Sequence, residues 1–106
     1  MKMNFEYRNI DEEYFEENDL AFIKRVIEKD NYRCLFIELK PGKVISPHTH
    51  AYNNQSFIFL EGEGELTVDK TKMKAIKDIV VFIESGSEHS LRNSGNNNLK
   101  YIEITV

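Results

Sequence analysis

The stretch "PGKVISPHTHAYNNQSFIFLEGEGE", residues 41–65, places two histidines one residue apart, between a Pro-Gly turn and an apolar run that ends in glycines. Side chains two residues apart on an extended segment point the same way, so His48 and His50 are predicted to share one face. Two neutral imidazoles converging from one strand form half of a typical transition-metal site. The pair therefore indicates metal binding, although a histidine beside a turn can also be an ordinary surface residue.

The third histidine, His89, lies in "IVVFIESGSEHSLRN", residues 79–93, directly after a turn and at the start of another expected strand. If that strand lies beside the first two, the His89 ring completes a cluster of three histidines. Gln55 begins the expected strand after the histidine pair. It has the same parity as Phe57 and Phe59, so all three side chains are expected to face one interior.

The rest of the chain alternates short β-rich runs with turn segments, which predicts a sandwich or barrel of strands. No long 3.6-residue apolar period competes with that prediction. The expected strands are 22–27, 32–39, 43–46, 56–61, 65–68, 73–76, 79–83, 89–92 and 99–105. Residues 79–83 are apolar at every position, so we expect both faces of this strand to be covered, the outer one by a second sheet or a partner subunit.

Residues 1–21 differ from the strand-rich remainder and are expected to form an arm or short helix that packs on the barrel through Tyr14 and Phe15. Residues 22–106 are then the barrel domain. A chain of 106 residues fits a single domain.

Composition and charge narrow the class of protein. The net charge of −4 and the scattered basic residues argue against a nucleic-acid partner. No apolar run approaches the ~18 residues that a membrane span needs, and the N-terminal segment has no apolar signal-peptide core. Cys34, the single cysteine, leaves no internal disulfide and is expected to be a buried thiol. These features favour a cytoplasmic protein.

A first ordered motif resembles that of the cupin family. The family motif has Gly, five residues, His, one residue, His, three or four residues, Glu, six residues and Gly. In this chain Gly42, His48, His50, Gln55 and Gly62 keep that spacing, with glutamine in place of the glutamate. The glycines are expected where turns need positive φ or a close backbone approach.

A second ordered motif strengthens the resemblance. The final glycine, histidine and asparagine of the family pattern are present as Gly86, His89 and Asn93. Asp78 and Glu84 replace the family's first glycine and its proline. We expect Asn93 to stabilise the adjacent turn through backbone hydrogen bonds.

The resemblance covers residues 22–106 and implies an all-β, double-stranded β-helix (jelly-roll) barrel. It implies that His48, His50, His89 and Gln55 point into the barrel mouth. It also implies a divalent transition metal (iron, manganese, nickel or zinc) and a homodimer. Further candidates for contact with a small-molecule ligand are Tyr52, Phe57, Phe59 and Tyr101.

Glutamine in place of glutamate changes the charge of the expected centre. Three imidazoles and an amide leave the +2 of a divalent ion uncompensated, which weakens metal binding and favours an anionic ligand. Gln55 could bind the metal directly or hydrogen-bond to a ligand.

Two functions from different classes remain open. The first is a metal-dependent enzyme, such as a dioxygenase, isomerase or lyase acting on a small oxygen-rich acid. The second is a non-catalytic small-molecule or sugar-binding or sensing barrel without bound metal.

Overall fold

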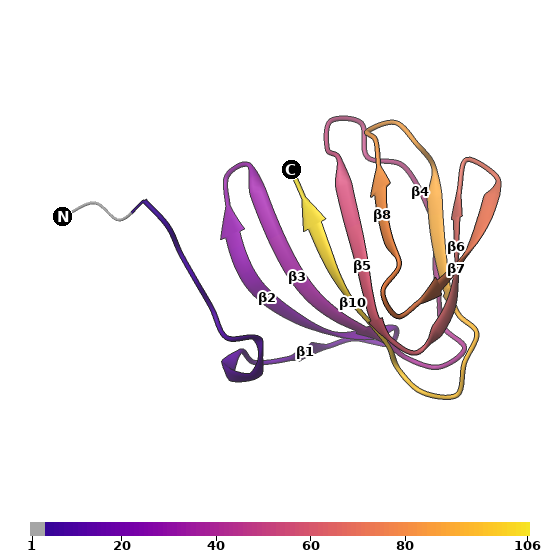
Figure 1. Ribbon diagram of the computed structural model, residues 1–106, viewed down its shortest axis with the longest axis horizontal. Helices are drawn as coiled ribbons and strands as arrows, with labels where there is room; N and C mark the ends of the chain where they lie inside the picture. The colour runs from indigo at the N-terminus through magenta and orange to yellow at the C-terminus, as the bar shows by residue number, and fades with distance from the viewer. Residues whose placement is uncertain (1–3) are drawn as a thin grey trace.

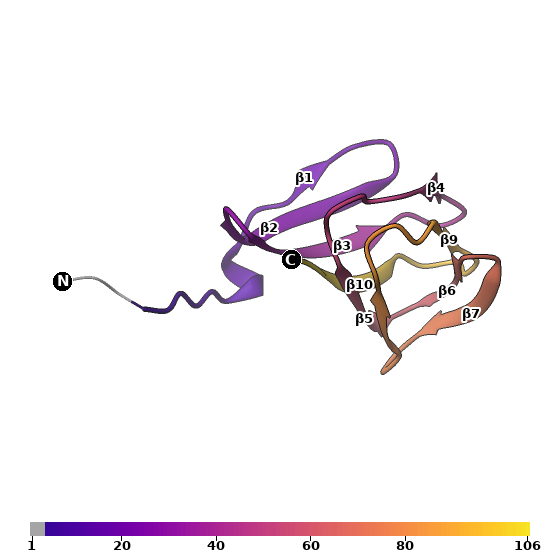
Figure 2. The same cartoon turned by 90° about the horizontal axis from the view of Figure 1, so that it is seen from above.

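The computed structural model describes residues 4–106, which form two antiparallel sheets facing each other across one apolar core (Figures 1 and 2). The larger sheet contains, in spatial order, β1 (Glu16–Glu17), β2 (Ala21–Lys29), β3 (Tyr32–Leu39), β10 (Leu99–Thr105), β5 (Gln55–Glu61) and β8 (Val80–Ile83). The smaller sheet contains β4 (Val44–His48), β9 (His89–Asn93), β6 (Glu63–Val68) and β7 (Thr71–Ile76). The predicted all-β jelly roll is confirmed.

The strand bounds agree closely with those predicted from the sequence. Residues 32–39 and 99–105 are strands over the predicted ranges. The strand predicted over 43–46 instead runs to His48, so the first histidine ends a strand. The strand predicted from Ile79 begins at Val80, because the Ile79 amide closes a turn by donating to the Ile76 carbonyl at 3.1 Å.

The N-terminal arm is partly structured. A 3-10 turn, Ile10–Glu12, leads into β1, which pairs with β2 at the edge of the larger sheet. Phe15 packs on Phe22 with ring centroids 5.7 Å apart, as predicted. Tyr14 is 91% exposed, so the prediction that it packs was wrong. Adjacent side chains on an extended segment point in opposite directions, and Phe15 is the one that faces the sheet.

The core lies between the sheets and is made of inward-facing apolar side chains. Leu39, Leu66 and Leu99 are fully buried, and Phe59 and Tyr101 are each 1% exposed. Burying one such side chain contributes about 1.5–3 kcal/mol. The core fills the barrel away from the histidines and leaves one end for polar residues.

The turns use the residues that the motifs predicted. Gly42, Gly62 and Gly86 have φ of +74°, +100° and +88°, and Asp78 has φ of +75° at a position where the family pattern has glycine. A Cβ at position 62 would lie 2.8 Å from the carbonyl oxygen of Asn98. Gly62 is therefore required both by its backbone angle and by this close approach.

Asn93 stabilises a turn between the sheets, as predicted. Its Nδ2 donates to the carbonyls of Leu39 at 2.8 Å and Asn97 at 2.9 Å, and its Oδ1 accepts from the Gly95 amide at 2.9 Å. The side chain is 1% exposed, and its bond to the Leu39 carbonyl is buried.

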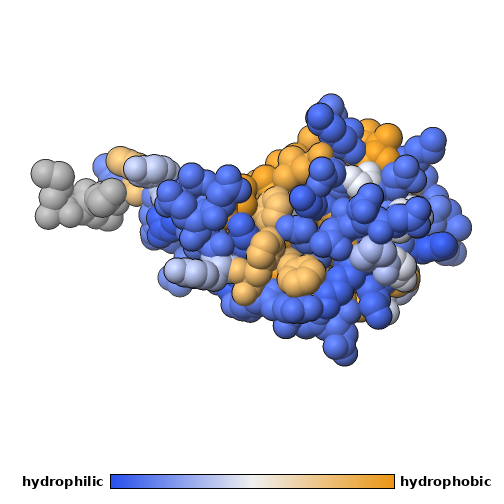
Figure 3. All heavy atoms as spheres, turned by 90° about the horizontal axis from the view of Figure 1, so that it is seen from below, coloured by the Kyte–Doolittle hydropathy of each residue, from blue (hydrophilic) through white to orange (hydrophobic). Residues whose placement is uncertain are grey.

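The outer face of the larger sheet is apolar and open at β8. Val80 and Phe82 are 65% and 59% exposed, so the predicted covering of this strand on both faces does not occur within one chain. In the space-filling view an apolar band crosses a surface that is otherwise polar (Figure 3). Cys34 is half-buried, less than predicted, and burial raises the pKa of its thiol. Residues 4–106 contain no helix with the length and apolar character of a membrane span.

Candidate metal centre

The three histidines converge at one end of the barrel. His48 ends β4 and His89 begins β9, and the two residues face each other in the strand register. His50 follows in the loop after β4. The ring centroid of His48 lies 4.3 Å from that of His89 and 5.0 Å from that of His50. One nitrogen of each ring lies within 4.8 Å of the others.

Backbone carbonyls fix the tautomer of two of these rings. The Nδ1 of His48 lies 2.8 Å from the carbonyl oxygen of Ser46, and the Nδ1 of His89 lies 3.1 Å from that of Ser87. A carbonyl oxygen only accepts, so each Nδ1 carries the proton and each Nε2 presents a lone pair. Histidine ligands of metals are commonly oriented by such a bond.

The Nε2 of His89 is buried and has no hydrogen-bond partner among residues 4–106. An unpaired buried polar atom is costly, and here it faces two further imidazoles. The three rings therefore fit a transition metal, for which neutral imidazole is a preferred ligand.

Burial favours the neutral form of His50 and His89. Burial lowers the pKa of His50, and the nearby charges of His48 and Arg33 lower it further. Burial also lowers the pKa of His89, opposed by its bond to the Ser87 carbonyl. Both rings are therefore unprotonated at neutral pH, as a metal ligand must be.

Gln55 lies at the start of β5 and is 2% exposed. Its Nε2 donates to Oε1 of Glu103 and to Oγ1 of Thr105, both at 3.1 Å. Because the amide nitrogen donates to both of these oxygens, the amide oxygen points elsewhere. That Oε1 is buried and has no partner in the described part of the chain.

Two charged residues near this end were missed from the sequence. Glu103 faces inward from β10, and Arg33 faces inward from β3, opposite Thr105. Burial raises the pKa of Glu103, against the charge of Arg33 and the bond from Gln55. Both residues occupy inward positions of otherwise apolar strands, and that parity is the signal that could have found them.

The other residues proposed from the sequence lie at different depths. Tyr52 is 94% exposed in the loop after His50. Phe57 is buried, with its ring centroid 6.0 Å from that of His89. Phe59 and Tyr101 lie deeper, and their ring centroids are 5.5 Å apart within the core.

Backbone hydrogen bonds hold the loops around the histidines. The Gly86 amide donates to the His50 carbonyl at 2.8 Å, and the Ser85 amide donates to Oδ1 of Asn54 at 2.9 Å. The amides and carbonyls of Asn54 and Val106 also pair with each other. The loop that carries His50 is thus tied both to the loop before His89 and to the C-terminal residue.

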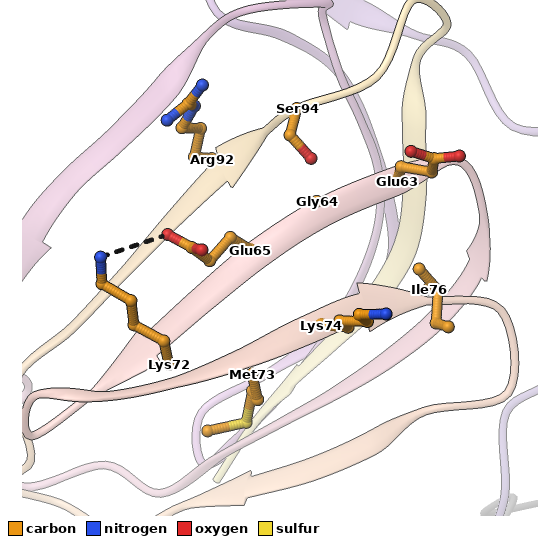
Figure 4. A pocket seen from close by; sticks show the side chains of 9 residues that line it. All are labelled: Glu63, Gly64, Glu65, Lys72, Met73, Lys74, Ile76, Arg92 and Ser94. Carbon is orange, nitrogen blue, oxygen red and sulfur yellow. Dashed lines mark ion pairs between the residues drawn. The ribbon is translucent and has the colours of Figure 1, made fainter.

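A shallow groove lies on the outer face of the smaller sheet (Figure 4). Lys72, Glu65 and Arg92 line it, and Nζ of Lys72 lies 3.9 Å from Oε1 of Glu65. Arg92 is exposed whereas His89 and Leu91 on the same strand are buried. The groove is therefore on the opposite face of the sheet from the histidines.

The fold and the spacing of the histidines define a cupin barrel. The family model described as "Cupin domain" matches residues 35–105, and the chain belongs to this family. The match includes all three histidines and Gln55.

Curated relatives are similar over the barrel. Mannose-1-phosphate guanylyltransferase from Klebsiella pneumoniae is 30% identical over 79 residues, which are 74% of this chain and 17% of that protein. The chain thus spans about a sixth of the length of that relative. The oxalate-binding protein of Thermotoga maritima is 27% identical over 92 residues, which cover 85% of this chain and 76% of the relative.

Solved structures share the fold at low identity. KdgF from Halomonas has a TM-score of 0.86 at 15% identity, with 94% of this chain and 93% of that chain covered. A predicted oxalate decarboxylase from Thermotoga maritima has a TM-score of 0.85 at 21% identity, with 92% and 96% covered.

Proposed function

We propose that this cupin binds one divalent transition metal through His48, His50 and His89, with the Gln55 amide oxygen as a fourth ligand. The observation that carries the proposal is the buried, unpartnered Nε2 of His89, which faces two further imidazoles in the described structure. The Gln55 Oε1 is buried and unpartnered as well, as expected of a ligand atom. Iron, manganese, nickel and zinc all accept such a donor set.

We propose further that the centre holds a small anionic molecule. Three imidazoles and one amide carry no charge, so the bound ion keeps its +2 and attracts an anion. When bound, the metal supplies Lewis-acid polarisation of an oxygen of that molecule. Dioxygenase, isomerase and lyase reactions on an oxygen-rich acid are the enzymatic functions that use such a centre. The relatives named for mannose 1-phosphate and oxalate support an anionic ligand.

The protein residues around the centre have separate tasks. The Ser46 and Ser87 carbonyls hold two imidazoles in the tautomer that presents Nε2. Glu103 and Thr105 hold the Gln55 amide with its oxygen free. The Phe57 ring, which belongs to the core, packs against the His89 ring.

Metal analysis tests the proposal. The protein is purified without added metal, exposed to Zn²⁺ and dialysed. Elemental mass spectrometry is then expected to find one zinc ion per chain. His48→Ala combined with His89→Ala should remove the ion. Tyr52→Ala is the matched control, because Tyr52 lies between the proposed ligands but is 94% exposed. Metal-free wild-type protein that still binds a small acid would support the non-catalytic barrel instead.

We also propose that two copies pair through the outer face of the larger sheet. Outward positions on β5, β8 and β10 include Ile58, Val80, Phe82, Ile102 and Ile104, and none of these is charged. A self-complementary apolar face of this kind suits a two-fold dimer.

Light scattering tests the dimer. Wild-type protein is expected at twice the chain mass and Phe82→Asp at the mass of one chain. Phe82 is 59% exposed in the single chain, so the substitution leaves the monomer folded. Tyr14→Asp, at an exposed aromatic residue of the arm, should remain dimeric. A monomeric wild-type protein would contradict the pairing.

A further inference from the structure

Arg33 places a guanidinium at the histidine end of the barrel. It lies on β3 with the same parity as Leu35, Ile37 and Leu39, which are buried in the core. In the strand register Arg33 faces Thr105 on β10. The inward parity directs the side chain toward the barrel interior, and the residue is half-buried.

The Arg33 guanidinium has no protein anion paired with it among the residues that the structure describes. Its Nε is buried and lacks a hydrogen-bond partner among residues 4–106. Arg33 takes part in none of the ion pairs of that region, whereas Arg8 and Arg25 are both paired with glutamates. A buried, unpaired donor on a charged group is unfavourable unless a ligand completes it.

The nearest inward carboxylate is engaged elsewhere. Oε1 of Glu103 accepts from the Gln55 amide, and Glu103 forms no ion pair with Arg33 in the described residues. Arg33 is therefore not neutralised by the inward carboxylate on the neighbouring strand.

The strand register sets the distance from Arg33 to the metal centre. Arg33, Thr105 and Gln55 form one inward row across β3, β10 and β5. Neighbouring strands are about 4.8 Å apart, so the backbones at Arg33 and Gln55 are about 10 Å apart. The arginine side chain shortens that gap, and a ligand with a few carbon atoms between its two ends spans the remainder.

We propose that Arg33 is a specificity-determining residue that binds the distal carboxylate of a small dicarboxylate whose other carboxylate is held at the histidine centre. Arginine suits this role because its planar guanidinium binds a carboxylate through two parallel hydrogen bonds. The inference rests on the proposed metal centre and names the class of its ligand: a short acid with two anionic ends.

Calorimetric titration of the Zn²⁺-loaded protein tests the inference with two probes. Succinate has two carboxylates, and succinamate has the same length with one carboxylate replaced by an amide. Wild-type protein is expected to bind succinate about tenfold or more tightly than succinamate, the ratio that a charge-assisted hydrogen bond provides. Equal affinities for the two probes would overturn the inference without any variant.

Variants assign the preference to Arg33. Arg33→Met should bind the two probes with equal affinity while retaining its zinc and its melting temperature. If Arg33→Met does not fold, Arg33→Lys keeps the charge and should retain only part of the preference, since it cannot form the paired bonds. Arg92→Met is the matched control, because Arg92 lies on the outer face of the smaller sheet. An undiminished preference in Arg33→Met or Arg33→Lys would overturn the assignment.

The experiment separates the two proposals. Zinc bound by wild-type protein with no preference for succinate refutes the role of Arg33 and leaves the metal centre intact. Wild-type protein that fails to bind zinc refutes the metal centre and, with it, the role of Arg33.

Discussion

Replacing Gln55 with glutamate tests the contact at the base of the proposed centre. The amide nitrogen of Gln55 lies 3.1 Å from Oε1 of Glu103. In Gln55→Glu that donor becomes a second acceptor, and two carboxylates face each other in a buried site. At 3.1 Å and an effective dielectric constant of about 20, their repulsion is about 5 kcal/mol.

The pair can avoid this repulsion by keeping one proton. Holding a proton at pH 7 on a carboxyl of ordinary pKa, about 2.5 units lower, costs about 3.4 kcal/mol. This cost is smaller than the repulsion, so the pair is expected to share one proton. Burial already raises the pKa of Glu103 and reduces the cost. The metal-free variant should therefore lose up to about 3 kcal/mol at pH 7.

Chemical denaturation of the metal-free protein measures the effect. The loss in Gln55→Glu should grow from pH 5 to pH 8 and shrink when Zn²⁺ is added, because the ion replaces the shared proton. The double variant Gln55→Glu with Glu103→Gln restores one amide and one carboxylate and should recover most of the stability. A single variant as stable as wild type at pH 8, without recovery in the double variant, would refute the contact.

Three further predictions follow from groups described above. Because burial raises the pKa of Glu103, ionising this carboxyl costs stability as the pH rises above about 4.5. In thermal unfolding, Glu103→Gln should therefore be more stable than the wild-type protein at pH 8 but not at pH 4. Because the pKa values of His50 and His89 are lowered in the folded protein, the unfolded chain takes up protons first as the pH falls. The stability of the metal-free protein should therefore fall as the pH drops below about 6.5, and His50→Ala should reduce this dependence of stability on pH. Gly62→Ala should cost about 1–3 kcal/mol in urea denaturation, more than Gly42→Ala, which shares the positive φ but has no described atom within 4 Å of its Cβ.

The fold could be predicted because strands and turns follow local patterns, whereas the convergence of His89 with His48 and His50 was implied by the family resemblance. Strand parity predicted that His48 and His50 share one face. It also predicted that Gln55 faces the same interior as Phe57 and Phe59, and the two motif spacings gave the resemblance to the family. Turn residues with positive φ marked where strands end. These signals depend only on neighbouring residues and not on how the sheets are arranged.

Strand parity could assign Arg33 and Glu103 to the interior, but it could not place them beside the histidines. Arg33 and Glu103 are distant in sequence and reach the same end of the barrel because β10 pairs with β3. The position of Tyr14 depended on which of two adjacent aromatic residues turned inward. The open outer face at Phe82 could not be predicted either, because the sequence shows that this strand is apolar but not which of its faces the rest of the chain covers.

The carbonyls that orient His48 and His89 belong to the main chain, two residues before each ring. Replacing either serine with another amino acid removes no hydrogen-bond acceptor. The orientation of the two rings therefore tolerates substitutions that would be disruptive if a side-chain carboxylate were the acceptor. At Ser46 the following Pro47 also favours the extended conformation that presents the carbonyl. Pro47→Ala should therefore disturb the centre more than Ser46→Ala does.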